Sequence, residues 1–369
     1  MRVAIIHDWL TNMGGSERVI SVFHEMFPEA PIYTSVFERE NIAFPLRNAD
    51  IRTSFLQKLP KPLRKHQRLL PLMPYAFEQF DLSSYDLVIS SSHACAKGVI
   101  VRADTFHVCY CYTPMRYAWD MYHDYINPLK GLKRWFAIWQ LHKIRVWDQL
   151  NSQRVDQFIA ISQSVANRIK KHYGADSVVI APPVDIDRFR CTEEREDYYL
   201  VVSRLVAYKR VDIAIEACLY LGKKLVIIGI GEEEKYLKSI CAGKENQISF
   251  LGWQSEERVA DYLAKAKAFL FPGEEDFGLT MVEALASGCP VIAYGSGGAL
   301  DIITDGETGV LFEEQTVEGM ISAIIRFEQL SAQGVSFSPE ILRKHAEKFS
   351  VEIFKEKFLN LINQMISER

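Results

Sequence analysis

Two glutamates eight residues apart lie in and just after a glycine-containing loop that could bind phosphate and hydroxyl groups. Glu275 belongs to the stretch Glu275-Asp276-Phe277-Gly278-Leu279, and Glu283 lies about one turn into the helix that follows. The loop comes after the apolar run 268–271, so it connects a predicted strand to a helix whose first amides can bind an anion. Carboxylates there need hydroxyl donors, which sugars and ribose supply. The alternative is that both glutamates only complement the helix dipole.

A basic pair lies in a second strand-to-helix connection. Arg204 stands at the end of the predicted strand 198–203, and Lys209 is predicted to open the next helix. Two cations at the carboxyl end of a strand could neutralise a departing diphosphate, which stabilises a leaving group electrostatically. The alternative is an ordinary basic cluster on a helix surface.

Two weaker signals occur in the first half of the chain. Gly14-Gly15 precedes a predicted helix with Ser16 as its N-cap, and a backbone without side chains can approach a ligand closely. Gly-Gly can also be only a turn.

His93 follows the predicted strand 87–90 and could hydrogen-bond a sugar hydroxyl or a phosphate, although a lone histidine is more often structural. Gly229-Ile230-Gly231 lacks the third glycine of a dinucleotide fingerprint, so NAD binding is not expected.

The elements that must position these residues follow one pattern throughout the 369 residues. Apolar, β-branched runs alternate with helical patterns, which is typical of βαβ units and parallel sheets. The predicted strands are 3–7, 87–90, 106–110, 157–161, 198–203, 225–229, 248–251, 268–271, 291–293 and 309–311.

The chain is predicted to fold as two domains of the α/β class. Both would be Rossmann-like and doubly wound, facing each other across a cleft. Pro182-Pro183 and an acidic stretch predict a break, since two prolines cannot continue a helix or a central strand. The predicted parts are an N-terminal acceptor domain (1–180), a linker (181–197), a C-terminal donor domain (198–345) and a C-terminal helix (346–369) that could cross back to the N-terminal domain. Ligands of such sheets bind beyond the carboxyl ends of the strands.

Composition limits the class of protein. A hydrophobic fraction of 48% and a charged fraction of 24% are those of a soluble globular protein. Since there is no apolar run of membrane-spanning length and no signal peptide, we expect a cytoplasmic location. The seven cysteines are scattered without a CxxC, which indicates buried free thiols rather than disulfides or a zinc site. No nucleic-acid partner is expected.

Positive charge is concentrated in the first half. Residues 1–190 hold 24 Lys and Arg against 18 Asp and Glu, a net charge of +6, whereas residues 191–369 have a net charge of -10. Two basic stretches with interleaved apolar and aromatic residues, 51–77 and 128–147, favour an anionic membrane surface. The alternative is ordinary domain surface. The cations of the first stretch are Arg52, Lys58, Lys61, Arg64, Lys65 and Arg68, and those of the second are Lys130, Lys133, Arg134, Lys143 and Arg145.

Taken together, these segments resemble family 4 of the retaining glycosyltransferases, which have the GT-B fold. The family's E-x7-E element looks like Glu275 and Glu283, its basic pair like Arg204 and Lys209, and its glycine loop like Gly14-Gly15. The segments 7–11, 92–98 and 112–120 look more narrowly like those of bacterial O-antigen and exopolysaccharide mannosyltransferases.

The resemblance implies a role for each candidate residue. Glu275 and His93 would bind the transferred sugar, and Glu283 the donor ribose. Arg204, Lys209 and Gly15 would contact the diphosphate, with Gly14 in the same loop. Amides around Phe277, Gly278 and Leu279 would hold sugar and phosphates, and the base would lie near Trp253.

The resemblance also implies a reaction. A hexose, mannose from GDP-mannose, would pass with retention of configuration to a lipid-linked oligosaccharide of a surface polysaccharide. The enzyme would be peripheral on the inner face of the cell membrane. No cofactor or metal is expected, because cationic side chains neutralise the diphosphate. The alternatives are a UDP-hexose donor, a sugar-nucleotide epimerase and a catalytically silent binding subunit.

Overall fold

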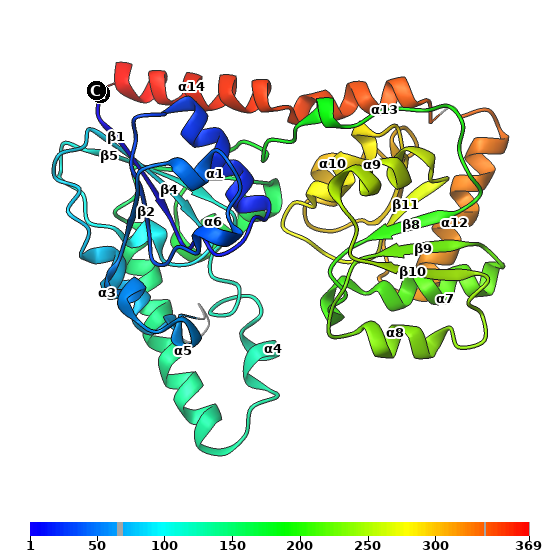
Figure 1. Cartoon of the computed structure of the whole chain (residues 1–369), viewed down its shortest axis with the longest axis horizontal. Coiled ribbons are helices and arrows are strands. Elements are labelled where there is room, and N and C mark those ends of the chain that lie inside the picture. The colour runs from blue at the N-terminus through cyan, green and yellow to red at the C-terminus, as the bar shows by residue number, and fades with distance from the viewer. Residues whose placement is uncertain (65–68, 336, 369) are drawn as a thin grey trace. The chain divides into compact units, whose positions relative to one another are not determined.

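The computed structural model describes residues 1–64, 69–335 and 337–368, and it divides into two compact units, Met1–Ala181 and Pro182–Arg369. Each unit contains one sheet in which every paired strand is parallel, with α-helices in most of the connections between successive strands (Figure 1). The predicted α/β class with two doubly wound domains is therefore confirmed.

The first unit is built on a seven-stranded sheet of order β3-β2-β1-β4-β5-β6-β7. Its elements are β1 (Val3–His7), α1 (Gly15–Met26), β2 (Ile32–Thr34), β3 (Ile51–Thr53), α3 (Met73–Glu78), β4 (Leu87–Ser92), β5 (Phe106–Cys111), α4 (Tyr122–Ile126), α5 (Gly131–Ser152), β6 (Gln157–Ala160), α6 (Gln163–Tyr173) and β7 (Ser177–Val179).

The second unit is built on a six-stranded sheet of order β10-β9-β8-β11-β12-β13. Its elements are β8 (Tyr199–Val202), the 3-10 turn η7 (Ala207–Lys209), α7 (Val211–Leu221), β9 (Leu225–Ile228), α8 (Glu234–Ile240), β10 (Ile248–Gly252), α9 (Glu256–Lys265), β11 (Ala268–Phe271), α10 (Leu279–Ala286), β12 (Val291–Tyr294), α11 (Ala299–Ile302), β13 (Gly309–Phe312), α12 (Val317–Ala332), α13 (Pro339–Ala346) and α14 (Val351–Ser367).

Both sheets change direction at one point in their strand order. In the first sheet β1 lies between β2 and β4, and in the second β8 lies between β9 and β11. In each sheet, the chain therefore leaves two neighbouring strands toward opposite sides: β1 and β4 in the first sheet, β8 and β11 in the second. A crevice forms at the carboxyl ends of such a pair, and ligands of such folds bind there. The residues that follow β1, β4, β8 and β11 are thus the first to inspect for function.

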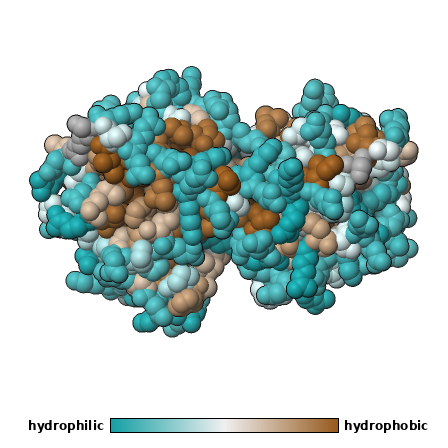
Figure 2. All heavy atoms as spheres, turned by 90° about the horizontal axis from the view of Figure 1, so that it is seen from above, coloured by the Kyte–Doolittle hydropathy of each residue, from teal (hydrophilic) through white to brown (hydrophobic). Residues whose placement is uncertain are grey.

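The central strands form because their sequences are continuously apolar. All four residues of β11 are buried, and Ile5 and Ile6 of β1 are fully buried. A strand covered by helices on both faces needs such a run rather than an alternating pattern. The surface is different, since the face in Figure 2 carries mostly hydrophilic residues with separate hydrophobic patches.

Local capping interactions determine where several helices begin. The Ser162 hydroxyl accepts a hydrogen bond from the amide of Val165 at 3.2 Å, which caps α6, and Gly174 ends that helix with φ at 72°. The prediction that Ser16 caps α1 was wrong. Gly14 is the N-cap residue, and the Ser16 hydroxyl instead donates to the Glu17 carboxylate at 2.9 Å.

Residues 181–197, predicted as a linker, begin where the two units divide. The amide of Val184 donates to the carbonyl of Phe349 at 2.9 Å, and Arg343 donates to the carbonyl of Phe189 at 2.6 Å. Both contacts lie within the second unit. Val184 and Phe189 are also buried, so this stretch packs on the C-terminal helices of its own unit.

His107 makes the first unit sensitive to acid. The side chain is buried, its Nε2 lies 2.8 Å from the Ser90 hydroxyl, and burial lowers its pKa from 6.5 to about 4. The unfolded chain takes up this proton first as pH falls, so stability is lost below pH 6.5. At pH 5 we expect the free energy of unfolding to be lower by about 2 kcal/mol than at pH 7.

Urea unfolding at the two pH values measures this loss. His107→Gln keeps a polar side chain without the titration, so it should flatten the pH dependence. His142→Gln, at an exposed position on α5, should leave the slope unchanged. Equal pH dependence in both variants would contradict the assignment to His107.

Candidate functional site

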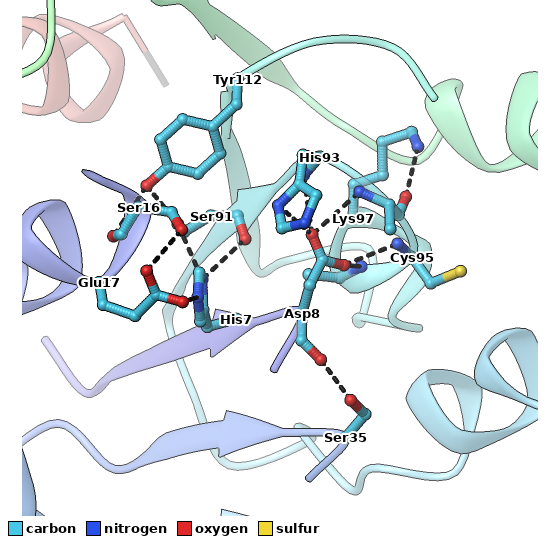
Figure 3. A network of polar contacts seen from close by, with 12 residues as sticks. His7, Asp8, Ser16, Glu17, Ser35, Ser91, His93, Cys95, Lys97 and Tyr112 are labelled. Carbon is cyan, nitrogen blue, oxygen red and sulfur yellow. Dashed lines mark hydrogen bonds and ion pairs between the residues drawn. The ribbon is translucent and has the colours of Figure 1, made fainter. Parts of the chain in front are cut away.

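In the first unit, a buried carboxylate organises the carboxyl ends of β1 and β4 (Figure 3). Asp8 follows β1 and is fully buried. Its two oxygens accept hydrogen bonds from four consecutive amides, those of residues 93 to 96, at 2.7, 2.9, 2.7 and 2.7 Å. One side chain therefore fixes the whole loop that carries His93.

His93 is held on several sides. Its Nδ1 lies 3.2 Å from an Asp8 oxygen, and its ring stands edge-on to Trp9 at 4.5 Å and to Tyr112 at 6.1 Å between ring centres. Burial lowers the pKa of His93, with Asp8 opposing this in part. The imidazole is thus neutral at pH 7, and 28% of the side chain remains exposed to meet a ligand.

A second polar network joins the end of β1 to the start of α1 and includes His7, Ser91 and Glu17 (Figure 3). His7 Nδ1 lies 3.1 Å from the Ser91 hydroxyl, and His7 Nε2 lies 3.7 Å from Glu17. Burial raises the pKa of Glu17, but hydrogen bonds from His7 and Ser16 outweigh it, so the net pKa is lowered. A charged, buried carboxylate therefore supports the start of α1.

Gly14 packs tightly over this carboxylate. A Cβ atom at position 14 would lie 3.0 Å from Glu17 Oε2, so a side chain there would require a small shift of the Glu17 carboxylate. Gly15 is the first residue of α1, so the first amides of that helix have no partner within the helix and lie in the loop that follows the carboxyl end of β1. Among the first-unit candidates, Gly14 thus lies against Glu17 and His93 against Asp8, two buried carboxylates for which the sequence predicted no role.

In the second unit, the loops after β8 and β11 meet. The Lys209 ammonium forms an ion pair with the Glu275 carboxylate, and both side chains are largely buried. The prediction that Lys209 opens a helix was wrong, because it ends η7 and Arg210, with φ at 50°, separates it from α7. This turn directs the lysine toward Glu275 rather than along a helix surface.

The start of α10 requires glycine. Gly278 is its N-cap residue, with φ at 98°, and a Cβ atom there would lie 2.4 Å from the Met281 side chain and 3.3 Å from the Phe271 ring. Phe277 is buried and stacks edge-on against Phe349 at 5.8 Å. The amides from Leu279 onward are therefore held at a rigid helix N-terminus, a geometry suited to phosphate.

A second glycine pair supports the peptide of Glu275. Gly297 has φ at 60°, and a Cβ atom there would lie 2.2 Å from the Glu275 carbonyl oxygen. The amide of Gly298 donates to the same oxygen at 2.9 Å. The loop after β12 can approach the Glu275 carbonyl this closely only because these two residues have no side chains. Gly297 and Gly298 therefore position Glu275, and no sequence motif had indicated this role.

The remaining candidates occupy the same edge of the second sheet. Glu283 is buried in the second turn of α10. Arg204 is exposed just after β8 and forms no ion pair with any residue that the structure describes. Trp253 follows β10 at the outer end of the sheet and is 72% exposed, so its indole ring can stack on a flat ligand.

The chain contains one acidic triplet of a kind that can bind a metal ion. Asp185-Ile186-Asp187 is an Asp-x-Asp sequence, but the Asp187 carboxylate pairs with Arg343 at 3.2 Å. No three His, Cys, Asp or Glu side chains are grouped to hold a metal within residues 1–64, 69–335 and 337–368. In the same ranges, no helix is both long and apolar enough to span a bilayer.

The two basic stretches differ in the structure. In 51–77, Arg52 pairs with Asp50, Lys61 with Glu40 and Arg64 with Glu38, so much of its charge is neutralised locally. Lys65 and Arg68 lie outside the described residues. The second stretch contains α5, in which Leu132, Trp135, Phe136 and Trp139 are exposed by 86, 66, 53 and 42%.

Two family models cover the chain in succession. Residues 13–188 match the model described as Glycosyltransferase Family 4, and residues 185–349 match the model described as Glycosyl transferases group 1.

Curated relatives match over part of their length. Poly(glycerol-phosphate) alpha-glucosyltransferase of Bacillus subtilis is 32% identical, over 46% of this chain and 26% of that protein. D-inositol 3-phosphate glycosyltransferase of Rhodococcus opacus is 27% identical, over 55% of this chain and 53% of that protein. The chain thus spans about half or less of these relatives.

Solved structures match over the whole chain and share the fold. Sucrose-phosphate synthase from Thermosynechococcus elongatus aligns with a TM-score of 0.76 at 15% identity, over 100% of both chains. HepE from Anabaena in complex with UDP aligns with a TM-score of 0.73 at 16% identity, over 99% of this chain and 100% of that one. With two successive family matches that together span residues 13–349 and this shared two-sheet architecture, the chain belongs to the GT-B glycosyltransferases of the family 4 and group 1 type.

Proposed function

We propose that this protein is a retaining, metal-independent hexosyltransferase that takes a hexose from a sugar nucleotide, GDP-mannose in the first instance. The acceptor we propose is a lipid-linked saccharide of a surface polysaccharide. The observation that carries the proposal is the ion pair between Lys209 and Glu275 at the switch point of the second sheet, beside the N-terminus of α10. A cation, a carboxylate and the first amides of a helix are groups that can bind a sugar diphosphate, so their proximity supports the proposal.

The donor diphosphate would replace Glu275 as the partner of Lys209. Arg204 and the first amides of α10 add positive charge on the same group, and no metal is then required. Glu275, released from the lysine, accepts hydrogen bonds from hydroxyls of the hexose, and Glu283 from those of the ribose. His93, neutral at pH 7, contributes a hydrogen bond to the sugar.

Transfer would proceed on one face of the hexose. The bond between the anomeric carbon and the diphosphate oxygen breaks, and the acceptor hydroxyl oxygen bonds to the same face of that carbon. Its proton passes to the departing diphosphate oxygen. The protein positions the reactants and stabilises the charge that develops on the diphosphate, which are the two largest contributions available to such a site.

For the nucleotide of the donor there is a specific alternative to GDP, namely UDP. HepE from Anabaena has been solved with UDP-glucose at 17% identity to this chain, and a curated relative is named as a glucosyltransferase. The exposed Trp253 can stack on guanine or uracil alike. UDP-glucose is therefore the second donor that we propose to test.

A donor-hydrolysis screen tests the whole proposal. Purified protein is incubated with GDP-mannose, UDP-glucose and other sugar nucleotides, with and without EDTA, and free nucleoside diphosphate and the anomeric form of the product are measured. Release from one donor that EDTA does not reduce, with the configuration retained, supports the proposal. Conversion of the sugar without nucleotide release would indicate an epimerase, and no turnover of any donor a silent binding subunit.

We also propose peripheral docking of α5 on the cytoplasmic, anionic face of the cell membrane. Residues 131–139 are exposed almost throughout, and the first half of α5 extends away from the sheet of its unit (Figure 1). Aromatic and basic side chains together suit the boundary between lipid headgroups and acyl chains. Lys143 lies over the Trp139 ring at 3.9 Å, so charge and aromatic surface are already paired there.

Replacing Trp135 and Phe136 together with alanine should weaken binding to phosphatidylglycerol liposomes about tenfold or more, since two interfacial aromatic side chains are lost. Sedimentation with liposomes at low and high salt measures this. Tyr220→Ala removes an aromatic residue of 78% exposure from the second unit and should change nothing. Equal binding by the double variant and the native protein would exclude α5 as the docking element.

A further inference from the structure

The first unit contains a pocket that the proposed donor and membrane sites do not use. It has a volume of about 370 Å³ and is lined by Trp119, Asp120, Tyr122, His123, Arg145 and His172. These residues come from the segment after β5, from α4 and from the facing parts of α5 and α6. Trp119 and Asp120 end the stretch 112–120, which looks like the corresponding segment of bacterial O-antigen and exopolysaccharide mannosyltransferases. This stretch has no role in the proposed donor site.

Arg145 is the main charged group that the pocket offers to a ligand. Its Nε donates to the carbonyl of Ala118 at 2.7 Å, and its guanidinium lies 4.7 Å from the Tyr122 ring centre and 5.7 Å from that of Trp119. No carboxylate within residues 1–64, 69–335 and 337–368 pairs with it. The guanidinium is thus oriented by a carbonyl and two rings, while its two terminal nitrogens keep their donors.

The acidic group of the pocket is already paired. Asp120 accepts from His172 Nε2 at 3.0 Å and lies 3.6 Å from Arg168. Its negative charge is therefore balanced by neighbours on α6, and Arg145 leaves the pocket with an excess of positive charge. His123 lies exposed at the rim and adds a further donor or acceptor.

The wall of the pocket is held by several side-chain contacts. The Trp119 ring stacks on His172 at 4.6 Å, and its Nε1 donates to the fully buried Asp148 at 2.8 Å. Asp148 also pairs with the buried Lys97 and accepts from the Tyr173 hydroxyl at 2.9 Å. A ligand would consequently meet a preformed site rather than one that must be ordered on binding.

We infer that this pocket binds a phosphoryl group carried by the lipid-linked acceptor, which extends the proposed function to the recognition of that acceptor. A planar guanidinium with two free nitrogens matches the oxygens of a phosphate and can bind two of them at once. The pocket shares α5 with the exposed aromatic residues proposed for membrane docking, so a phosphate close to the lipid surface lies within reach of this helix. The acceptor class is therefore a phosphate-linked, rather than a neutral, glycolipid.

Binding of octyl phosphate to the full chain tests the inference without any transfer reaction. Calorimetry is done with excess GDP and UDP present, so that the proposed donor site is occupied. We expect one octyl phosphate per chain and no measurable binding of octyl glucoside, which has the same alkyl chain without phosphate. If inorganic phosphate bound as tightly as octyl phosphate, the site would be one for free phosphate, and the acceptor assignment would be overturned.

Arg145→Gln should weaken octyl phosphate binding about tenfold or more, because a charge-assisted, two-point contact is lost. Arg145→Lys keeps the charge and guards against a folding defect, and it should give an intermediate affinity. Lys171→Gln removes a positive charge next to His172 from outside the pocket and should leave the affinity unchanged. Unchanged binding by Arg145→Gln, or no binding by the native protein, would disprove the inference.

The two proposals can fail separately. Absence of donor hydrolysis together with intact octyl phosphate binding would refute the transferase proposal alone. Donor hydrolysis without octyl phosphate binding would refute only the pocket.

Discussion

Replacing Lys209 with alanine is expected to lower the turnover of the sugar nucleotide about 100-fold or more. In the structure the Lys209 ammonium pairs with Glu275 beside the N-terminus of α10. The variant removes the cation proposed to stabilise the leaving diphosphate, and preorganised groups of this kind contribute about that factor each. It also leaves the carboxylate of Glu275 without its partner, next to the site of the incoming diphosphate.

Steady-state kinetics on the donor that the screen identifies will measure the effect. Lys224→Ala is the matched control, since Lys224 is exposed at the amino end of β9, at the opposite edge of the same sheet. It should retain normal turnover. Lys209→Arg keeps the charge and should recover part of the activity. A near-normal rate for Lys209→Ala would remove the basis for placing the diphosphate at this loop.

Arg204 is expected to contribute to binding of the donor diphosphate through its charge alone. It is exposed and has no ion pair among the described residues, whereas Lys209 is held by Glu275. From the sequence alone, Arg204 and Lys209 have the same predicted role. The structure makes them different, because a cation that is already positioned loses less conformational freedom on binding than one that is free.

The sequence was sufficient for the architecture because parallel sheets give a strong signal. Strands such as β1 and β11 are continuously apolar, and the rule that ligands bind at carboxyl ends pointed to His93, Arg204 and Glu275. The short strands β2, β3 and β7 have three residues each and were missed. Runs of that length differ little from ordinary loop segments in composition.

The helix α5 was not recognised as a helix for a different reason. Apolar side chains in its first half are exposed, and the buried residues are confined to its second half, from Leu141 onward. A periodicity argument expects one apolar face toward a core, so it fails where the apolar residues face solvent or a partner. The same feature makes α5 the best candidate for a docking surface.

Two parts of the candidate site depend on contacts between residues far apart in the sequence. Gly297 and Gly298 support the Glu275 peptide by close backbone approach, and Asp8 binds a loop 85 to 88 residues away. Neither contact leaves a local pattern in the sequence. The signal available for Asp8 was its position, one residue beyond a buried strand of the central pair.

Replacing Asp8 with asparagine is expected to lower the free energy of unfolding of the first unit by about 3 to 5 kcal/mol. The carboxylate is fully buried and accepts four amide hydrogen bonds, from residues 93 to 96. Asparagine turns one of the two acceptor oxygens into a donor that faces amide N–H groups. At least two of the four bonds are then lost in a buried site, which is the costly kind of loss.

The same substitution should also abolish transferase activity, because it releases the loop that holds His93. Urea unfolding, followed with the activity assay, separates the two effects. Asp104→Asn replaces a carboxylate that is 62% exposed and pairs with Arg102 at the surface, so it should cost about 0.5 kcal/mol or less. If Asp8→Asn were as stable as the native protein, the four amide bonds would not be holding the loop. If it were stable and also active, His93 would not need the position that Asp8 gives it, and its proposed contact with the sugar would fail as well.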